Sequence, residues 1–271
     1  MSTMDFPGTS SPEIRGNASF TSVALGVAWR YLTNIRKNPA FLLPPLIFPI
    51  FFLVAFAGGL SAVGDVPNFD YPDYTAFQFA FVLLQSSAFA GVFAGFTIAA
   101  DFEFGFARRL LLAAPRRSGI IAGYALVSIG RCVFTAVLIG GLAMAGGMEV
   151  NGNAADFAAL LLLALLVNIT ATLFAAGMAL RFRTISAAPA MQVPVFLILF
   201  LAPVYVPVNL LHGWIQSVAQ VNPVTPMLEA ARGLLQGDLV SIGAAFGCVV
   251  GLLVLAVPWA VRGLRSAERA G

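Results

Sequence analysis

Few residues in this sequence are of types that carry out covalent or metal chemistry. Its two cysteines, Cys132 and Cys248, lie in separate apolar blocks, and His212 is the one histidine. Neither a disulfide scaffold nor a zinc site, which needs about four grouped ligands, is expected. Lys37, the one lysine, lacks the Gly-Lys-Ser/Thr context of a phosphate-binding loop, and no Gly-x-Ser-x-Gly nucleophile motif occurs. We therefore expect no metal, no bound cofactor and no catalytic residue in this chain.

Charged residues are equally scarce inside the apolar stretches. No acidic residue lies well inside any of them, whereas ion-coupled transporters place Asp, Glu or His within their membrane helices. Arg131 is the exception, at roughly 18 Å along a helix that begins at Ser118. A buried Arg either pairs with carbonyls or a polar residue such as Asn168, or lines a substrate path. Both interpretations of Arg131 remain open from the sequence.

The composition places these residues in a membrane protein. The 271 residues are 59% hydrophobic and only 10% charged, with a mean hydropathy of +0.90. Soluble domains carry about 25% charged residues, and disordered chains combine low hydrophobicity with high net charge. The basic residues are dispersed between apolar blocks, which argues against nucleic-acid binding. We expect an all-α, polytopic membrane protein.

Uncharged stretches of about 20 residues, the length of a helix that crosses a bilayer, recur along the chain. They predict six transmembrane helices within a domain at 39–262, at 40–64, 74–100, 118–148, 157–180, 186–206 and 239–261. The uncharged block that starts at Thr184 continues to Leu228, and prolines and glycines break it near its middle. We therefore expect an outer re-entrant helical segment at 207–238, between spans five and six.

Small residues in two of these spans should let helices approach each other closely. They are Gly91 and Gly95 in the second span, and Gly243, Gly247 and Gly251 in the sixth. Packing within one subunit is expected ahead of packing between subunits.

The distribution of Arg and Lys sets the expected orientation. Of the 15 basic residues, 13 lie in the N-terminal segment, the loops after the second and fourth spans, and the C-terminal tail. Because cytoplasmic loops carry the excess of Lys and Arg, both termini are expected in the cytoplasm. They would be a disordered tail at 1–18 and a short tail at 263–271.

Residues 19–38 should form an amphipathic helix on the inner membrane surface, with its apolar face in the acyl boundary of the lipid, and Asn38-Pro39 should end it. Its apolar positions recur at helical spacing and are Phe20, Val23, Val27, Tyr31 and Ile35. The residues assigned to an interfacial role are Trp29, Arg30, Arg36 and Lys37. A plain lead-in to the first span, with no further function, is the alternative.

The loop at 101–117 should contain a second short amphipathic helix. Asp101 and Glu103 at its start suit a helix N-terminus, and Pro115 ends it. Its apolar face is formed by Phe102, Phe106, Leu110, Leu111 and Leu112. Such a face favours a docking element held under the membrane over a simple loop.

A third segment predicts a short helix on the outer side, before the sixth span. Thr225 is expected as its N-cap and Pro226 as its first residue. Glu229 should pair with Arg232 three residues later, and Gly237 should be the C-cap.

These features together resemble the membrane subunit of type-2 ABC exporters, a group that includes daunorubicin-resistance permeases and polysaccharide exporters. The pattern Asp101-x-Glu103-x-Gly105, followed by Leu-rich residues and Pro115, is similar to the coupling-helix region of that family. The pattern from Pro207 to Arg232 resembles its outer re-entrant segment. The resemblance covers nearly the whole chain, with departures at Arg108 and His212.

The resemblance implies roles for two sets of residues. Coupling to an ATPase is implied for Asp101, Glu103, Gly105, Phe106, Arg108, Arg109, Leu110 and Pro115. A place in the outer re-entrant segment is implied for Pro207, Gly213, Trp214, Asn222, Pro223, Thr225, Glu229 and Arg232.

The resemblance also implies partners. The chain would be half of a permease dimer, either a homodimer or a heterodimer, in the lipid of a bacterial plasma membrane. A separate ABC ATPase, in two copies, would bind ATP and Mg²⁺. An apolar, aromatic path suits export of a drug, lipid or glycolipid. Candidate path residues are Phe48, Phe52, Phe89, Phe93 and Arg131, although any one Phe could instead face lipid.

Three other functions stay open. A polysaccharide or lipid-linked glycan exporter of the same family would show a continuous channel lined with aromatic residues. An ion-coupled secondary transporter would keep working after ATP depletion. A membrane enzyme would turn over substrate as the purified chain alone.

Overall fold

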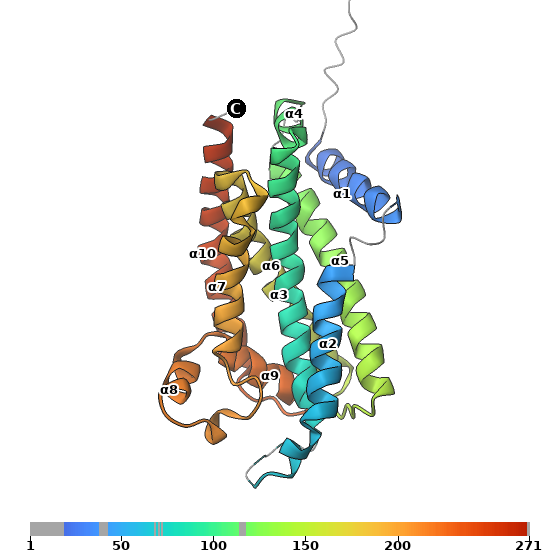
Figure 1. Cartoon of the computed structure of the whole chain (residues 1–271), viewed down its shortest axis with the longest axis vertical. Helices are drawn as coiled ribbons and strands as arrows, with labels where there is room; N and C mark the ends of the chain where they lie inside the picture. Colours follow the sequence, from blue (N-terminus) through green and yellow to red (C-terminus); the bar gives the residue numbers. More distant parts are fainter. Residues whose placement is uncertain are drawn as a thin grey trace, which may run out of the picture.

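The computed structural model describes residues 19–37, 43–67, 69, 71, 73–113 and 118–269. Over this part of the chain every regular element is a helix, and the long helices run side by side along one axis (Figure 1). The predicted tail at 1–18, the Asn38-Pro39 helix end and Pro115 lie outside the described residues, as does the side chain of Arg108. The all-α prediction is confirmed for the described ranges.

Four helices of the described chain are long and apolar enough to cross a membrane. They are α3 (Tyr74–Glu103), α5 (Ser118–Ala145), α6 (Ala154–Phe182) and α10 (Ile242–Arg269). The last of them contains 263–269, most of the expected C-terminal tail.

Two shorter apolar helices, α2 (Leu43–Gly59) and α7 (Ala188–Phe200), stand where the first and fifth spans were expected. The helical rise gives α7 a length of about 20 Å, less than the roughly 30 Å hydrocarbon core of a bilayer. The protein is therefore a multi-pass helical protein, and the count of six spans stays a prediction.

The remaining helices lie at the two ends of the bundle (Figure 1). At one end, α1 (Phe20–Lys37) lies obliquely along the outside of the bundle, near α4 (Phe106–Ala113). At the other end lie α8 (Trp214–Val221) and α9 (Val224–Gln236). Short 3-10 turns occur at η2 (Ser61–Asp65), η3 (Ile185–Ala187) and η4 (Val208–Leu210).

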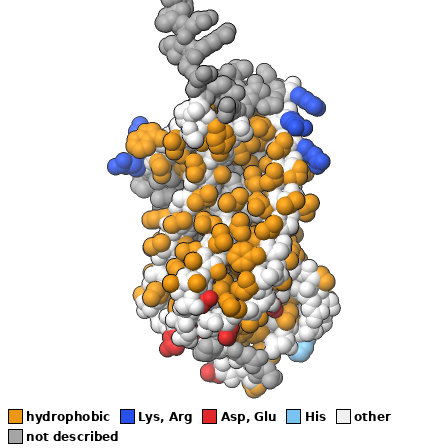
Figure 2. Space-filling view, turned by 180° about the vertical axis from the view of Figure 1, so that it is seen from behind, with side chains coloured by type: hydrophobic (Ala, Val, Ile, Leu, Met, Phe, Trp, Pro, Cys, Tyr) orange, Lys and Arg blue, Asp and Glu red, His pale blue; other side chains and the backbone are white. Residues whose placement is uncertain are grey.

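The two ends differ in charge. On the face drawn in Figure 2, blue basic side chains gather toward the end that carries α1, and red acidic ones lie at the opposite end. We call the first the basic end, with Arg36, Lys37, Arg109, Arg181, Arg183, Arg262 and Arg265. We call the second the acidic end, with Asp65, Asp73, Glu149, Asp156, Glu229 and Asp238. This separation matches the charge bias between loops that the sequence shows.

The central helix of the bundle is α3, which is buried along nearly its whole length. It packs most extensively against α6, where a Cβ on Gly91 would lie 2.6 Å from the Asn168 carbonyl oxygen. A Cβ on Gly95 would lie 2.5 Å from the Ala175 Cβ. The prediction that these glycines pack within one subunit is confirmed, because the two backbones touch there.

The glycines of α10 behave differently. A Cβ added to Gly243, Gly247 or Gly251 would meet nothing within 4 Å among the described residues. The prediction of packing within one subunit is therefore wrong for this stripe, which faces away from the other helices.

The Gly91→Ala substitution should destabilise the protein, because the new methyl group has no room against α6. Overpacking of this kind costs about 1–3 kcal/mol, so the midpoint of thermal unfolding in detergent should fall. Gly130→Ala on α5, where a Cβ meets nothing within 4 Å, is the matched control. An equal midpoint for both variants would contradict the close α3–α6 contact.

Candidate functional site

A two-bond ion pair at the basic end joins α1 to the last turn of α3. Arg30 donates from both terminal nitrogens to the two Asp101 carboxylate oxygens, at 2.9 Å each. Asp101 is only 8% exposed, and the Tyr124 hydroxyl of α5 also donates to it. A planar guanidinium matches a carboxylate in this two-bond geometry, which makes the pair directional as well as charged. It is the one ion pair within 4.0 Å among the described residues.

The Arg30 side chain also holds the start of α4. Its guanidinium carbon lies 3.5 Å from the centroid of the Phe106 ring, in a cation–π contact. The hydrogen bond to Asp101 raises the pKa of Arg30 above its ordinary value, so the side chain stays charged. Arg30, Asp101, Phe106 and Tyr124 thus bring α1, α3, α4 and α5 together, and we call them the Arg30 cluster.

The rest of α1 is seated on α5 by close backbone contact. A Cβ on Gly123 would lie 2.7 Å from the Ala24 carbonyl oxygen and from the Val27 Cβ. The prediction that the face with Val27 enters the lipid is therefore wrong, because this face packs on the protein. The exposed large apolar residues of α1 are Phe20, Leu25, Trp29 and Leu32, and Arg36 and Lys37 are also exposed.

Glu103 makes a second connection, from the end of α3 to the start of α7. Its carboxylate accepts from the Ile185 backbone N–H at 2.6 Å and from the Thr184 hydroxyl at 3.0 Å. The acids were expected at the N-terminus of the loop helix, and this is wrong: they end α3. Glu103 instead accepts from the first backbone N–H of η3, that of Ile185, and η3 leads into α7.

The turn between α3 and α4 depends on Gly105, whose φ of +75° is strained for any residue with a Cβ. Beyond it, Leu110 is half-buried against the bundle and Arg109 is exposed. Phe104 is 78% exposed, the largest value among the exposed apolar residues at the basic end. The short helix expected in this loop is therefore present as α4.

Three residues of this region were missed by sequence reasoning. Tyr124 lies inside an expected span, and Thr184 and Ile185 lie beside the fifth, so no local pattern links them to Asp101 or Glu103. The exposure of Phe104 had a weak indication in the sequence. Phe104 is the middle of three phenylalanines at alternate positions, Phe102, Phe104 and Phe106.

Arg131 is buried and pairs within the protein. It donates to the Tyr31 hydroxyl at 3.0 Å and to the Ala90 carbonyl at 3.4 Å. Asn168, the partner named from the sequence, instead donates to Ser128 and to the Ser87 carbonyl. The contacts therefore agree with pairing to a carbonyl and a polar residue, although the predicted partner is wrong.

At the acidic end, α9 starts earlier than expected. It begins at Val224 after Pro223, and the Asn222 side-chain oxygen accepts from the Val224 N–H at 2.9 Å. The N-cap prediction for Thr225 is wrong, because its hydroxyl donates to the Ala219 carbonyl of α8 at 2.6 Å. Gly237 is the C-cap as predicted, with a φ of +85°.

Arg232 is fully buried and holds this end together. It donates to the carbonyls of Phe77, Pro203 and Val204, and its guanidinium lies 3.4 Å from the Phe77 ring centroid. The predicted ion pair with Glu229 is absent from the described contacts, and Glu229 accepts from Ser241 at 3.1 Å.

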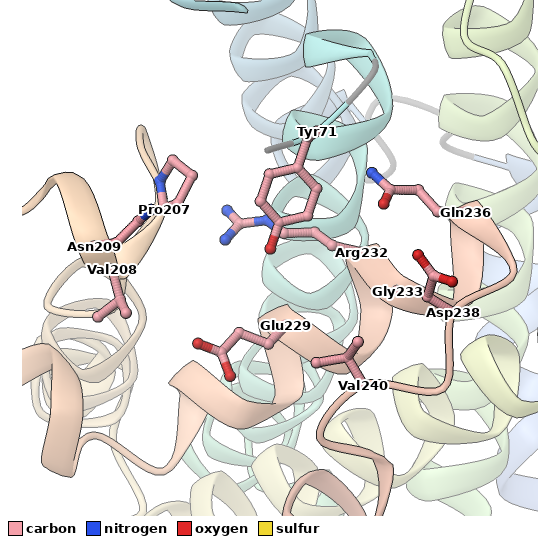
Figure 3. Close-up of a pocket in the computed structure, with 10 residues that line it drawn as sticks. All are labelled: Tyr71, Pro207, Val208, Asn209, Glu229, Arg232, Gly233, Gln236, Asp238 and Val240. Carbon is pink, nitrogen blue, oxygen red and sulfur yellow. The ribbon is translucent and has the colours of Figure 1, made fainter. Parts of the chain in front are cut away.

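The residues of the expected outer segment are thus brought together only in part. Arg232, Glu229 and Pro207 line one pocket of about 290 Å³, shown in Figure 3. Gly213, with a φ of +70°, and the exposed Trp214 lie outside that lining.

Three of the four predicted path phenylalanines meet where α2, α3 and α7 pack together. The Phe48 ring lies 4.7 Å from Phe52 and 5.8 Å from Phe89, centroid to centroid. Phe200 of α7, which was not predicted, lies 5.6 Å from Phe52. Phe93 instead pairs with Phe96, at 5.1 Å. We call Phe48, Phe52, Phe89, Phe196 and Phe200 the aromatic cluster.

Loss of the Asp101 charge should loosen α1. We expect Asp101→Asn to raise amide hydrogen exchange in α1 about fivefold, equivalent to about 1 kcal/mol. The effect should be no larger, because the Arg30 side chain is 35% exposed and water screens its charge. Asp238→Asn at the acidic end is the control. Unchanged exchange in α1 would show that the pair does not hold this helix.

Comparisons with known proteins agree on one family. A profile described as ABC-2 type transporter matches residues 24–235. The chain is 23% identical over 269 residues to the daunorubicin resistance ABC transporter permease protein DrrB1 of Streptomyces coeruleorubidus, covering 95% of this chain and 91% of that protein.

Two ycf38 proteins are also similar. The one from Pyropia yezoensis is 23% identical over 210 residues, which cover 76% of this chain and 71% of that protein. The one from Porphyra purpurea is 26% identical over 211 residues, which cover 75% and 70%. Since the family profile spans most of the helical bundle, the chain belongs to the ABC-2 type transporter family and is a membrane permease subunit of an ABC transporter.

Proposed function

We propose that this permease exports a hydrophobic or amphiphilic compound from the cytoplasm or inner leaflet, driven by ATP hydrolysis on a separate subunit. Two permease chains, identical or different, would form the membrane part, and one ATPase would dock on each. The basic end would face the cytoplasm of a bacterial cell, in keeping with the excess of Arg and Lys there. The observation that carries the proposal is the Arg30 cluster.

Force from the ATPase would enter through α4. This helix follows a glycine turn, and the exposed Phe104 and Arg109 offer an apolar and a charged contact beside it. Aromatic and arginine side chains are frequent anchors at protein interfaces. Since Phe106 lies on Arg30 and Arg30 holds Asp101, a displacement of α4 would also move α1 and the end of α3.

Glu103 would pass this displacement to α7. Its hydrogen bonds to Thr184 and Ile185 join the end of α3 to the start of that helix. The far part of α7 carries Phe196 and Phe200, which belong to the aromatic cluster. A shift of α7 relative to α2 and α3 would therefore rearrange this cluster.

The surroundings of the aromatic cluster favour an apolar or amphiphilic substrate. Phe48, Phe52, Phe89 and their neighbours on α7 belong to one hydrophobic core. Apolar sites select ligands chiefly by the apolar surface they bury, whereas glycans need many hydrogen-bonding groups. The similar permease from Streptomyces coeruleorubidus bears a daunorubicin-resistance name, which is in keeping with an amphiphilic substrate.

The proposed docking contact is tested by Phe104→Ala. Removal of an exposed aromatic anchor should reduce co-purification of the partner ATPase with the full-length permease by roughly tenfold or more. Phe157→Ala, which changes a 48% exposed residue at the start of α6 near the acidic end, should leave co-purification unchanged. Equal recovery of the ATPase with both variants would contradict docking at α4.

The proposed transmission through Glu103 is tested in vesicles that contain the permease and its ATPase. We expect Glu103→Ala to lower ATP-driven transport by roughly 5- to 150-fold, the range of common coupling energies, while ATP hydrolysis continues. Glu149→Ala, at an exposed acid of the acidic end, should transport normally. Transport that survives in Glu103→Ala, or that needs no ATP in the unchanged protein, would refute the proposed mechanism.

A further inference from the structure

An apolar groove of about 420 Å³ lies between α6, α7, α9 and α10, away from the Arg30 cluster. Its lining includes Val167, Phe174, Val195, Leu252 and Trp259. The two lining side chains with polar hydrogens are already paired. The Thr170 hydroxyl donates to the Leu166 carbonyl at 2.8 Å, and the Trp259 ring N–H donates to the Phe174 carbonyl at 3.0 Å. The occupant therefore needs no hydrogen-bonding groups within the groove.

An aromatic platform lines the end of the groove nearest the basic end. The Trp259 ring stacks on Phe174, with centroids 6.3 Å apart and planes 14° from parallel. It also lies against α6 where a Cβ on Gly177 would be 2.3 Å from the ring, so nothing larger than glycine fits beneath it. The guanidinium carbon of Arg181 lies 3.5 Å from the Trp259 centroid. The apolar groove thus ends at a fixed positive charge.

The groove has the length of one half of a bilayer. From Val249 to Trp259 the lining of α10 extends about 15 Å, half of the roughly 30 Å hydrocarbon core. Trp side chains favour the level of the lipid headgroups, which is where Trp259 would place the mouth of the groove. Val224 and Met227 of α9 line it together with these residues of α10.

More cations lie near the same mouth. Arg262 and Arg265 follow Trp259 on α10 and are exposed. A second copy of the chain could cover the groove if the two copies were related by an axis along the membrane normal. Its arginines would then lie at the same depth in the membrane as these, and like charges at an interface are unfavourable. An occupant with a negative head and an apolar chain fits both features.

We propose that this groove binds an anionic phospholipid of the leaflet that meets the basic end, with an acyl chain along α10 and the phosphate at Arg181. This site is separate from the aromatic cluster and does not depend on which compound is exported. One nearby Arg favours an anionic lipid by about 1 kcal/mol, and this corresponds to a roughly fivefold preference over a zwitterionic lipid.

Trp259 itself can report on the occupant. The full-length chain carrying Trp29→Phe and Trp214→Phe has Trp259 as its single tryptophan. It is reconstituted in phosphatidylcholine vesicles with an equal minor fraction of either phosphatidylglycerol or phosphatidylcholine whose acyl chains are brominated near the ester linkage. We expect the brominated phosphatidylglycerol to quench Trp259 with about fivefold higher apparent affinity.

Substitutions distinguish the headgroup contact from the chain contact. Arg181→Gln should remove the preference for the anionic lipid, so that both lipids quench with equal apparent affinity, whereas Arg36→Gln on α1 should retain the preference. Thr170→Phe should fill the groove and lower quenching by both lipids, whereas Leu162→Phe, an exposed position of α6 outside the lining, should not.

Three results would overturn the proposal. Equal quenching by both lipids would indicate ordinary annular lipid. Absence of quenching by either lipid would indicate that a second copy covers the groove. Quenching that Thr170→Phe leaves unchanged would place the lipid outside the groove.

Discussion

The two-bond contact between Arg30 and Asp101 determines how the basic end is assembled. Asp101 ends the most buried helix of the described chain, and Arg30 belongs to a helix that lies on the outside of the bundle. A carboxylate with this little access to water is costly unless a cation and hydrogen bonds compensate it. Tyr124 and Phe106 complete the arrangement, so α5 and α4 share the same point of contact.

The same requirement acts on the other buried arginines. Arg131 satisfies it in part, with the Tyr31 hydroxyl and a carbonyl of α3, while its Nε has no partner among the described residues. These contacts tie α1 to the middle of the bundle. Arg232 satisfies it with three carbonyls and the face of Phe77. Each of the three arginines makes at least one hydrogen bond to a residue of α3, namely Asp101, Ala90 or Phe77. The helix that is most buried is therefore also the one to which the two ends are attached.

This architecture suits a subunit that receives its energy from elsewhere. The sequence has no Gly-Lys-Ser/Thr phosphate loop, and its family consists of transporter subunits. Asp101 and Glu103 lie two residues apart on α3, yet one holds the surface helix α1 and the other the start of α7. A push at α4 would thus reach both sides of the bundle through a single helix end.

Composition and spacing alone determined the helical membrane class and the order of the apolar segments. They also determined the helices at α1 and α4 and the glycine contact at Gly91. The length of an apolar stretch and the period of its apolar positions are local properties of a sequence, which is why they can be read without the fold. Hydrogen-bond partners that lie far apart in the chain could not be predicted from these local properties. Tyr124 for Asp101, Ile185 for Glu103 and the carbonyls for Arg232 depend on which helices become neighbours. What the apolar face of α1 packs against was decided in the same way, since Val23 and Val27 lie against glycines of α5. Many polar groups in the sequence could serve equally well as hydrogen-bond partners of these side chains. Only tertiary packing decides which one does, because it alone brings one of them within hydrogen-bond distance.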